Sequence, residues 1–144
     1  MDAEALLVPD IDDESAGFWE ATARGVLAIQ TCGACGALRH PPRPMCPRCN
    51  ATDSGWREVS GRGTVWSYVV AHPPLLPAYA ALAPYNVVLV ALDEDPTIRL
   101  IGNFLDRDGG APNSIDPESI DVGAPVTVVF EQRGALHLPQ WVRA

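Results

Sequence analysis

The only four cysteines of this 144-residue chain lie between Thr31 and Asn50, as two Cys-x-x-Cys pairs separated by ten residues. A Cys-x-x-Cys turn presents two thiolates on one side of a tight knuckle, and two facing knuckles supply the four tetrahedral ligands of a structural zinc site. Four thiolates leave no open coordination position, so a catalytic metal is not expected. The pattern predicts a closed site, with zinc as its ion and with the ligands Cys32, Cys35, Cys46 and Cys49.

The residues beside the cysteines favour the knuckle conformation. Gly36 follows the first pair and Asn50 follows the second, and these residue types readily adopt the left-handed backbone conformation. That conformation lets the following amides point back at the sulfurs. Pro47 fixes its own backbone angle inside the second turn. His40 lies between the pairs, where we expect a surface residue rather than a ligand.

Three other uses of the thiols remain open. They could be buried without a metal, form a reversible dithiol switch, or hold iron as in rubredoxin, which would make the chain an electron carrier. Metal analysis and the colour of the protein separate the iron interpretation from the zinc interpretation.

The composition is that of a globular protein of one domain, or of one domain with a small appendage. Hydrophobic residues make up 47 % of the chain, and no apolar run approaches the roughly 20 residues that a membrane span requires. The N-terminus is acidic where a signal peptide would be basic. We therefore expect a cytoplasmic protein with reduced thiols and no membrane association, in which a disulfide framework is not favoured.

The charge is unevenly distributed. Residues 1–25 hold seven acids and one arginine, residues 26–63 hold five arginines and two acids, and residues 64–144 hold nine acids and four arginines. The net charge is −8. Because contacts to phosphates supply most of the affinity for nucleic acid, an acidic C-terminal part argues against that class of partner.

The pattern of the remaining residues predicts a mainly β fold with one N-terminal helix. Residues 14–24 are predicted as a helix with Phe18, Trp19 and Ala21 on one side and Gly25 as its stop. Residues 1–12 are the one stretch expected to be disordered. A helix of about three turns is marginal alone, so it must dock on this chain or on another.

Strands are predicted before the first knuckle, after the second knuckle and throughout the C-terminal part. Two belong to the ribbon, and five short strands follow it, which is the pattern of a five-stranded OB-fold barrel. We therefore divide the chain into an acidic segment with a helix (1–25), a zinc ribbon (26–60) and an OB-fold (61–144). The predicted strands cover residues 26–32, 56–61, 63–71, 85–93, 97–104, 124–132 and 135–142.

The segment 72–85, HPPLLPAYAALAPY, is rich in proline but otherwise apolar. Prolines obstruct a regular helix or an interior strand, yet a free loop would be more polar. The segment is therefore expected to be covered, either by the open end of its own barrel or by a partner molecule.

The order of these parts resembles a known family. The stretches that carry the resemblance are FWEA, GVLAIQTCGACGALRHPPRPMCPRC, WREVSGRGTVWSYVV, PYNVVLVALDE and VGAPVTVVFE. Together they are similar to bacterial and archaeal proteins that join a rubredoxin-like zinc ribbon to an OB-fold, known as domain of unknown function 35. The resemblance extends from about residue 14 to residue 142.

This resemblance implies a non-catalytic accessory subunit with structural zinc. Family members accompany thiolase-like or MaoC-hydratase-like enzymes that act on acyl-CoA thioesters of steroids, aromatic acids or lipids, and the barrel can contact the CoA ester. The residues themselves contain no recognisable catalytic set, because the three histidines fall in separate segments. The candidate partner or acyl-CoA contacts are Phe18, Trp19, Arg39, Arg43, Leu75, Leu76, Tyr79 and Tyr85. An OB-fold that binds nucleic acid and the iron electron carrier remain the alternatives.

Overall fold

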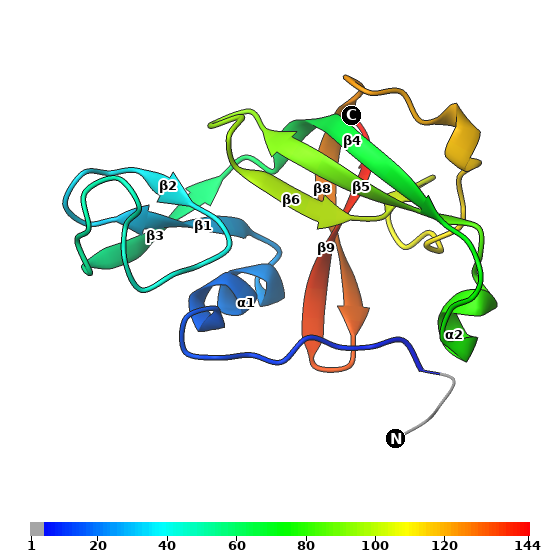
Figure 1. Cartoon of the computed structure of the whole chain (residues 1–144), viewed down its shortest axis with the longest axis horizontal. Helices are drawn as coiled ribbons and strands as arrows, with labels where there is room; N and C mark the ends of the chain where they lie inside the picture. Colours follow the sequence, from blue (N-terminus) through cyan, green and yellow to red (C-terminus); the bar gives the residue numbers. More distant parts are fainter. Residues whose placement is uncertain (1–4) are drawn as a thin grey trace.

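The protein, described by a computed structural model over residues 5–144, consists of a small ribbon and a barrel with a helix between them (Figure 1). Two short α-helices and nine strands form these parts within the described residues. A 3-10 helix at Pro117–Ser119 precedes the last two strands. The elements are α1 (Ala16–Ala23), β1 (Leu27–Cys32), β2 (Leu38–Arg39), β3 (Ser54–Val59), β4 (Arg62–Ala71), α2 (Pro77–Ala80), β5 (Tyr85–Leu92), β6 (Arg99–Gly102), β7 (Phe104–Leu105), β8 (Pro125–Arg133) and β9 (Leu136–Arg143).

The ribbon is a three-stranded antiparallel sheet in the order β2-β1-β3. Strand β1 pairs with β3 from Leu27↔Val59 to Cys32↔Ser54, so it leads straight into the first knuckle. The two predicted ribbon strands are confirmed. Strand β2 is an additional two-residue strand whose pairing with β1 returns the chain from the first knuckle.

The barrel sheet has the order β6-β5-β4-β8-β9-β7. It contains six strands where the sequence predicts five, because the predicted strand 97–104 divides at Asn103. Strand β6 pairs with β5, whereas β7 leaves that edge and pairs in parallel with β9. The change of partner brings the chain from one edge of the sheet to the other, which gives the sheet its barrel form.

Helix α1 packs against both the ribbon and the barrel. Its Phe18 is 6 % exposed and belongs to one hydrophobic core together with Ile29 of β1 and Trp141 of β9. A Cβ on Gly17 would collide with the indole of Trp56 in β3, so glycine permits this close approach of helix and ribbon. The predicted helix is confirmed, and its docking partner is this chain itself.

Two irregular segments lie along the barrel. The N-terminal segment, residues 5–12, runs past the tip of the β8–β9 hairpin toward α1 (Figure 1). It makes hydrogen bonds through Leu7, so the expectation of disorder is wrong for residues 5–12, while residues 1–4 lie outside the described part. The segment 72–85 includes α2, which begins at Pro77, where a missing N–H costs nothing.

None of the helices in residues 5–144 has the length and hydropathy that a membrane crossing requires.

Candidate metal centre and apolar pocket

The four cysteine sulfurs converge at the tip of the ribbon, and they all lie within 4.8 Å of one another. The Sγ atoms of Cys32 and Cys49 are 3.5 Å apart, and those of Cys35 and Cys46 are 3.7 Å apart. Tetrahedral ligands at the zinc–sulfur bond length of about 2.3 Å lie roughly 3.8 Å from one another. The donor set and its spacing therefore fit one four-coordinate metal ion.

Backbone amides stabilise the thiolate form of the buried sulfurs. The amides of Cys35 and Ala34 each donate to Cys32 Sγ at 3.4 Å, and they lower the pKa of the Cys32 thiol to about 6. The amides of Cys49 and Arg48 lower the pKa of Cys46 in the second knuckle in the same way.

The left-handed backbone conformation predicted for the residue after each cysteine pair is confirmed. Gly36 has φ 75° and Asn50 has φ 64°. Each also donates its backbone N–H to the carbonyl of the first cysteine in its knuckle. The knuckles are therefore preorganised as metal ligands.

Arg39, a candidate partner or acyl-CoA contact, is buried. Its side chain is 2 % exposed, and its Nε donates to Gln30 Oε1 at 2.9 Å. Its Nη2 donates to the carbonyl of Arg43 at 2.8 Å, and the amide of Arg43 donates to Gln30 Oε1 at 2.7 Å. Arg39 thus fixes the loop between the knuckles from inside, so its assignment as a contact residue is wrong.

A pocket of about 580 Å³ lies where α1, the loop after β2, the segment 72–85 and the barrel meet. Four of the eight predicted contact residues line it: Phe18, Trp19, Tyr79 and Tyr85. The Phe18 and Trp19 rings meet edge to face with their centroids 4.9 Å apart, and the Tyr79 and Tyr85 centroids are 6.1 Å apart. Two aromatic pairs from distant parts of the sequence thus line the same pocket.

The remaining predicted contacts lie elsewhere. Leu75 is half-buried and Leu76 is exposed, and neither lines the pocket. Arg43 is exposed and also lies outside the pocket lining. Part of the segment 72–85 therefore covers its own barrel, through Tyr79, Leu82 and Tyr85, while Leu76 points outward.

His40 lines the pocket and is half-buried rather than exposed. Its ring lies 5.6 Å from the ring of Phe18. Burial lowers the pKa of His40 to about 4, so the imidazole is neutral at pH 7. The expectation of an exposed residue is wrong because the ring of Phe18 in α1 packs against the imidazole.

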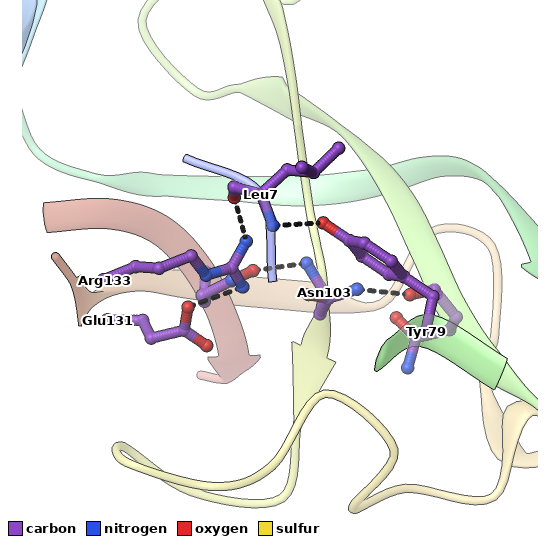
Figure 2. Close-up of polar contacts among 7 residues, drawn as sticks. Leu7, Tyr79, Asn103, Glu131 and Arg133 are labelled. Atoms are coloured by element: carbon purple, nitrogen blue, oxygen red, sulfur yellow. Dashed lines mark hydrogen bonds and ion pairs between the residues drawn. The ribbon is translucent and has the colours of Figure 1, made fainter. Parts of the chain in front are cut away.

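The N-terminal segment completes the pocket, which the sequence does not predict. Leu6 and Pro9 line it, and Leu7 between them is held at two points. Figure 2 shows the Leu7 amide donating to the Tyr79 hydroxyl oxygen at 3.0 Å and the Leu7 carbonyl accepting from Arg133 Nη1 at 3.3 Å. The available signal was weak: the apolar run LLV inside an otherwise acidic terminus.

Two family models match the chain. The ChsH2 rubredoxin-like zinc ribbon domain matches residues 19–54, and the ChsH2 C-terminal OB-fold domain matches residues 56–131. The first range covers the second half of α1 with β1, β2 and both knuckles, and the second covers most of β3 and the barrel up to β8.

Similar proteins carry three kinds of name. A "Probable enoyl-CoA hydratase alpha subunit" of Thermomonospora curvata is 41 % identical over 83 % of this chain and 34 % of its own length. The 3-oxo-4,17-pregnadiene-20-carboxyl-CoA hydratase alpha subunit of Mycobacterium tuberculosis is 30 % identical over 98 % of this chain and 40 % of its own length. A DUF35 domain-containing scaffold protein of Methanocaldococcus jannaschii is 30 % identical over 70 % of this chain and 64 % of its own. The chain thus spans well under half the length of the two hydratase subunits.

Solved structures agree with the fold. The Ltp2-ChsH2(DUF35) aldolase superimposes with a TM-score of 0.79 at 38 % identity and covers 94 % of this chain and 98 % of its own. A DUF35 protein of Sulfolobus solfataricus has a TM-score of 0.61 at 15 % identity over 92 % of this chain and 86 % of its own, which supports the fold alone. Together with the paired cysteines and the barrel, these matches show that the chain belongs to the DUF35 family, as a ChsH2-type zinc ribbon followed by an OB-fold domain.

Proposed function

We propose that this chain is a non-catalytic accessory subunit of a thiolase-like or MaoC-hydratase-like enzyme that acts on acyl-CoA thioesters. The observation that carries the proposal is the convergence of α1, the ribbon loop and the segment 72–85 on one aromatic pocket. The names of the relatives support it, since they include hydratase subunits, a scaffold protein and an aldolase complex.

Zinc is the proposed ion of the four-cysteine site. Its role is structural, because four thiolates close the coordination shell and leave no position for a reacting water. The metal fixes the loop between the knuckles, which includes His40 and therefore one wall of the pocket. We also retain the division into residues 1–25, 26–60 and 61–144 as the proposed domain limits.

The surface around the pocket is the proposed contact with the enzyme. Trp19 is half-buried at the pocket. Leu76, which directly precedes α2, is 58 % exposed. A few aromatic anchors usually supply much of the energy of an interface. Trp19→Ala should therefore weaken the complex by about 1 to 3 kcal/mol.

The test is co-expression with one thiolase-like and one MaoC-hydratase-like enzyme, followed by co-purification. Acyl-CoA turnover is then measured with and without this chain. Trp66→Ala is the matched control, because Trp66 is an exposed tryptophan on β4 that does not line the pocket. A chain that stays monomeric beside each enzyme, changes none of their rates and converts a thioester unaided would overturn the proposal.

A further inference from the structure

The described residues that line the pocket offer no free positive charge. Among the described residues that line it, Arg133 is the one arginine. Its Nη2 lies 2.7 Å from Glu131 Oε2, and its Nη1 donates to the carbonyl of Leu7 (Figure 2). The guanidinium is therefore already neutralised and hydrogen bonded.

The other titratable groups of the lining do not attract an anion either. The half-buried His40 is neutral at pH 7 because its pKa lies near 4, and Asp10 is an exposed carboxylate at the edge. Placing a phosphate or sulfonate in such a site without a compensating charge is costly. The pocket does not fit the phosphate-bearing end of a CoA thioester.

The size and walls of the pocket fit a bulky apolar group. Its volume of about 580 Å³ falls within the range of roughly 300 to 1,000 Å³ that is typical of ligand sites. The rings of Phe18, Trp19, Tyr79 and Tyr85 stand on its sides, and Val87 and Leu138 add aliphatic surface from the barrel. Rings on several sides favour a ligand with a flat or ring-bearing skeleton.

A few polar atoms remain at the barrel side. Gln140 and Asn103 line the pocket, and the Asn103 Nδ2 is engaged by the carbonyl of Asn86 at 2.6 Å. Pro41 of the ribbon loop and Asp10 of the N-terminal segment also line the pocket and are exposed. The pocket therefore opens to solvent beside these two residues. A ligand can thus place its apolar body inside while a longer polar part extends out.

We infer that this pocket binds the uncharged, ring-bearing or branched acyl body of a thioester and excludes its CoA end. The identification of the ligand as an acyl group rests on the proposed function. The preference for an uncharged ring-bearing ligand rests on the pocket itself and can be measured without a partner enzyme.

The experiment compares two fluorescent probes with the same aromatic skeleton on the metal-loaded full chain at pH 7.5. N-phenyl-1-naphthylamine is neutral, whereas 8-anilino-1-naphthalenesulfonate carries a negative charge. The neutral probe should bind with one site per chain and at least tenfold more tightly than the sulfonate, and it should quench part of the tryptophan fluorescence of the chain. Equal or tighter binding of the sulfonate would overturn the inference.

Two pocket variants and one control locate the binding. Leu82→Lys adds a cation to the lining while the long side chain can extend to solvent, so it should reverse the preference toward the sulfonate. Tyr85→Ala should weaken the neutral probe about tenfold, in line with the loss of one aromatic anchor. Trp66→Ala changes an exposed tryptophan outside the pocket lining and should leave both affinities unchanged.

The outcomes separate this inference from the proposed function. If probe binding is lost in Trp66→Ala but unaffected by Leu82→Lys, the probe binds elsewhere and the inference is wrong. This conclusion holds whether or not the Tyr85→Ala variant folds. If the chain co-purifies with its enzyme but prefers the sulfonate, only the inference about the pocket is wrong. If the chain prefers the neutral probe but binds neither class of enzyme, only the proposed function is wrong.

Discussion

The side chain of Asn86 in β5 forms two hydrogen bonds with the backbone of Phe104 in β7. Asn86 Nδ2 donates to the Phe104 carbonyl at 2.9 Å, and the Phe104 amide donates to Asn86 Oδ1 at 2.7 Å. Asn86 is fully buried. Its carboxamide thus takes the place of a strand partner where β7 has left the edge of β5, and it holds the barrel closed beside the pocket.

Replacing Asn86 by alanine should lower the free energy of unfolding by about 2 to 4 kcal/mol, because it leaves a buried N–H and a buried C=O without partners. Chemical denaturation followed by circular dichroism measures this. Asn113→Ala is the control, since Asn113 is exposed and the change should cost less than about 0.5 kcal/mol. Equal effects of the two substitutions would show that the carboxamide does not close the barrel.

Cys32→Ser or Cys49→Ser should remove most of the bound metal and make the ribbon sensitive to protease, while the barrel keeps its β-type circular dichroism. The reason is that structural zinc contributes roughly 10 kcal/mol or more to small four-ligand sites. Ala34→Ser is the control in the same knuckle, because it adds a hydroxyl and keeps all four thiolates. Metal content per chain and limited proteolysis are measured; a full equivalent of metal in the cysteine variants contradicts the ligand assignment.

The metal of the purified protein should be zinc, with one ion per chain and no visible colour. Elemental analysis and an absorption spectrum check this. The spacing of the four sulfurs accepts iron as well, so the measurement decides between a structural site and an electron carrier. A red protein with one iron and a reversible potential would reverse the assignment.

The stability of the protein should fall on acidification through His40. Its folded-state pKa is about 4, below the ordinary value of 6.5, so the unfolded chain binds the proton first as the pH falls. The stabilisation is therefore complete above pH 6.5 and is lost progressively toward pH 4. Between pH 7.5 and pH 5.5 the loss is about 1.4 kcal/mol.

The measurement for His40 is the difference in unfolding free energy between the native protein and His40→Gln at each pH. The difference cancels the other titrating groups that the two proteins share. His72→Gln replaces an exposed histidine and should reproduce the pH dependence of the native protein. A pH dependence that is unchanged in His40→Gln would contradict the burial of a neutral imidazole.

Tyr79→Phe should release the N-terminal segment without unfolding the chain. It removes the hydroxyl oxygen that accepts from the Leu7 amide but keeps the ring in the pocket wall. Amide hydrogen exchange at Leu7 should accelerate, while global stability changes by less than about 1.5 kcal/mol, the value of one hydrogen bond. Tyr68→Phe, outside the pocket, should leave the exchange at Leu7 unaltered.

The sequence by itself determined the local parts of this protein. The two knuckles follow from residues within a few positions of each cysteine, since Gly36 and Asn50 set the backbone that turns the amides to the sulfurs. The strands of the barrel follow from alternation over five to ten residues, and α1 from its stop at Gly25. These features depend on contacts close along the chain, so the pattern alone is enough to predict them.

The tertiary structure decided what the local pattern leaves open. Arg39 is buried because Gln30 and the carbonyl of Arg43 supply its hydrogen-bond partners inside the ribbon, and the sequence shows only an arginine in a polar segment. The predicted strand 97–104 divides because β7 meets β9, which lies more than thirty residues later. Leu7 meets Tyr79 across 72 positions. Such contacts form only when the chain has closed around its core, so the pocket belongs to the fold and cannot be read from any one segment.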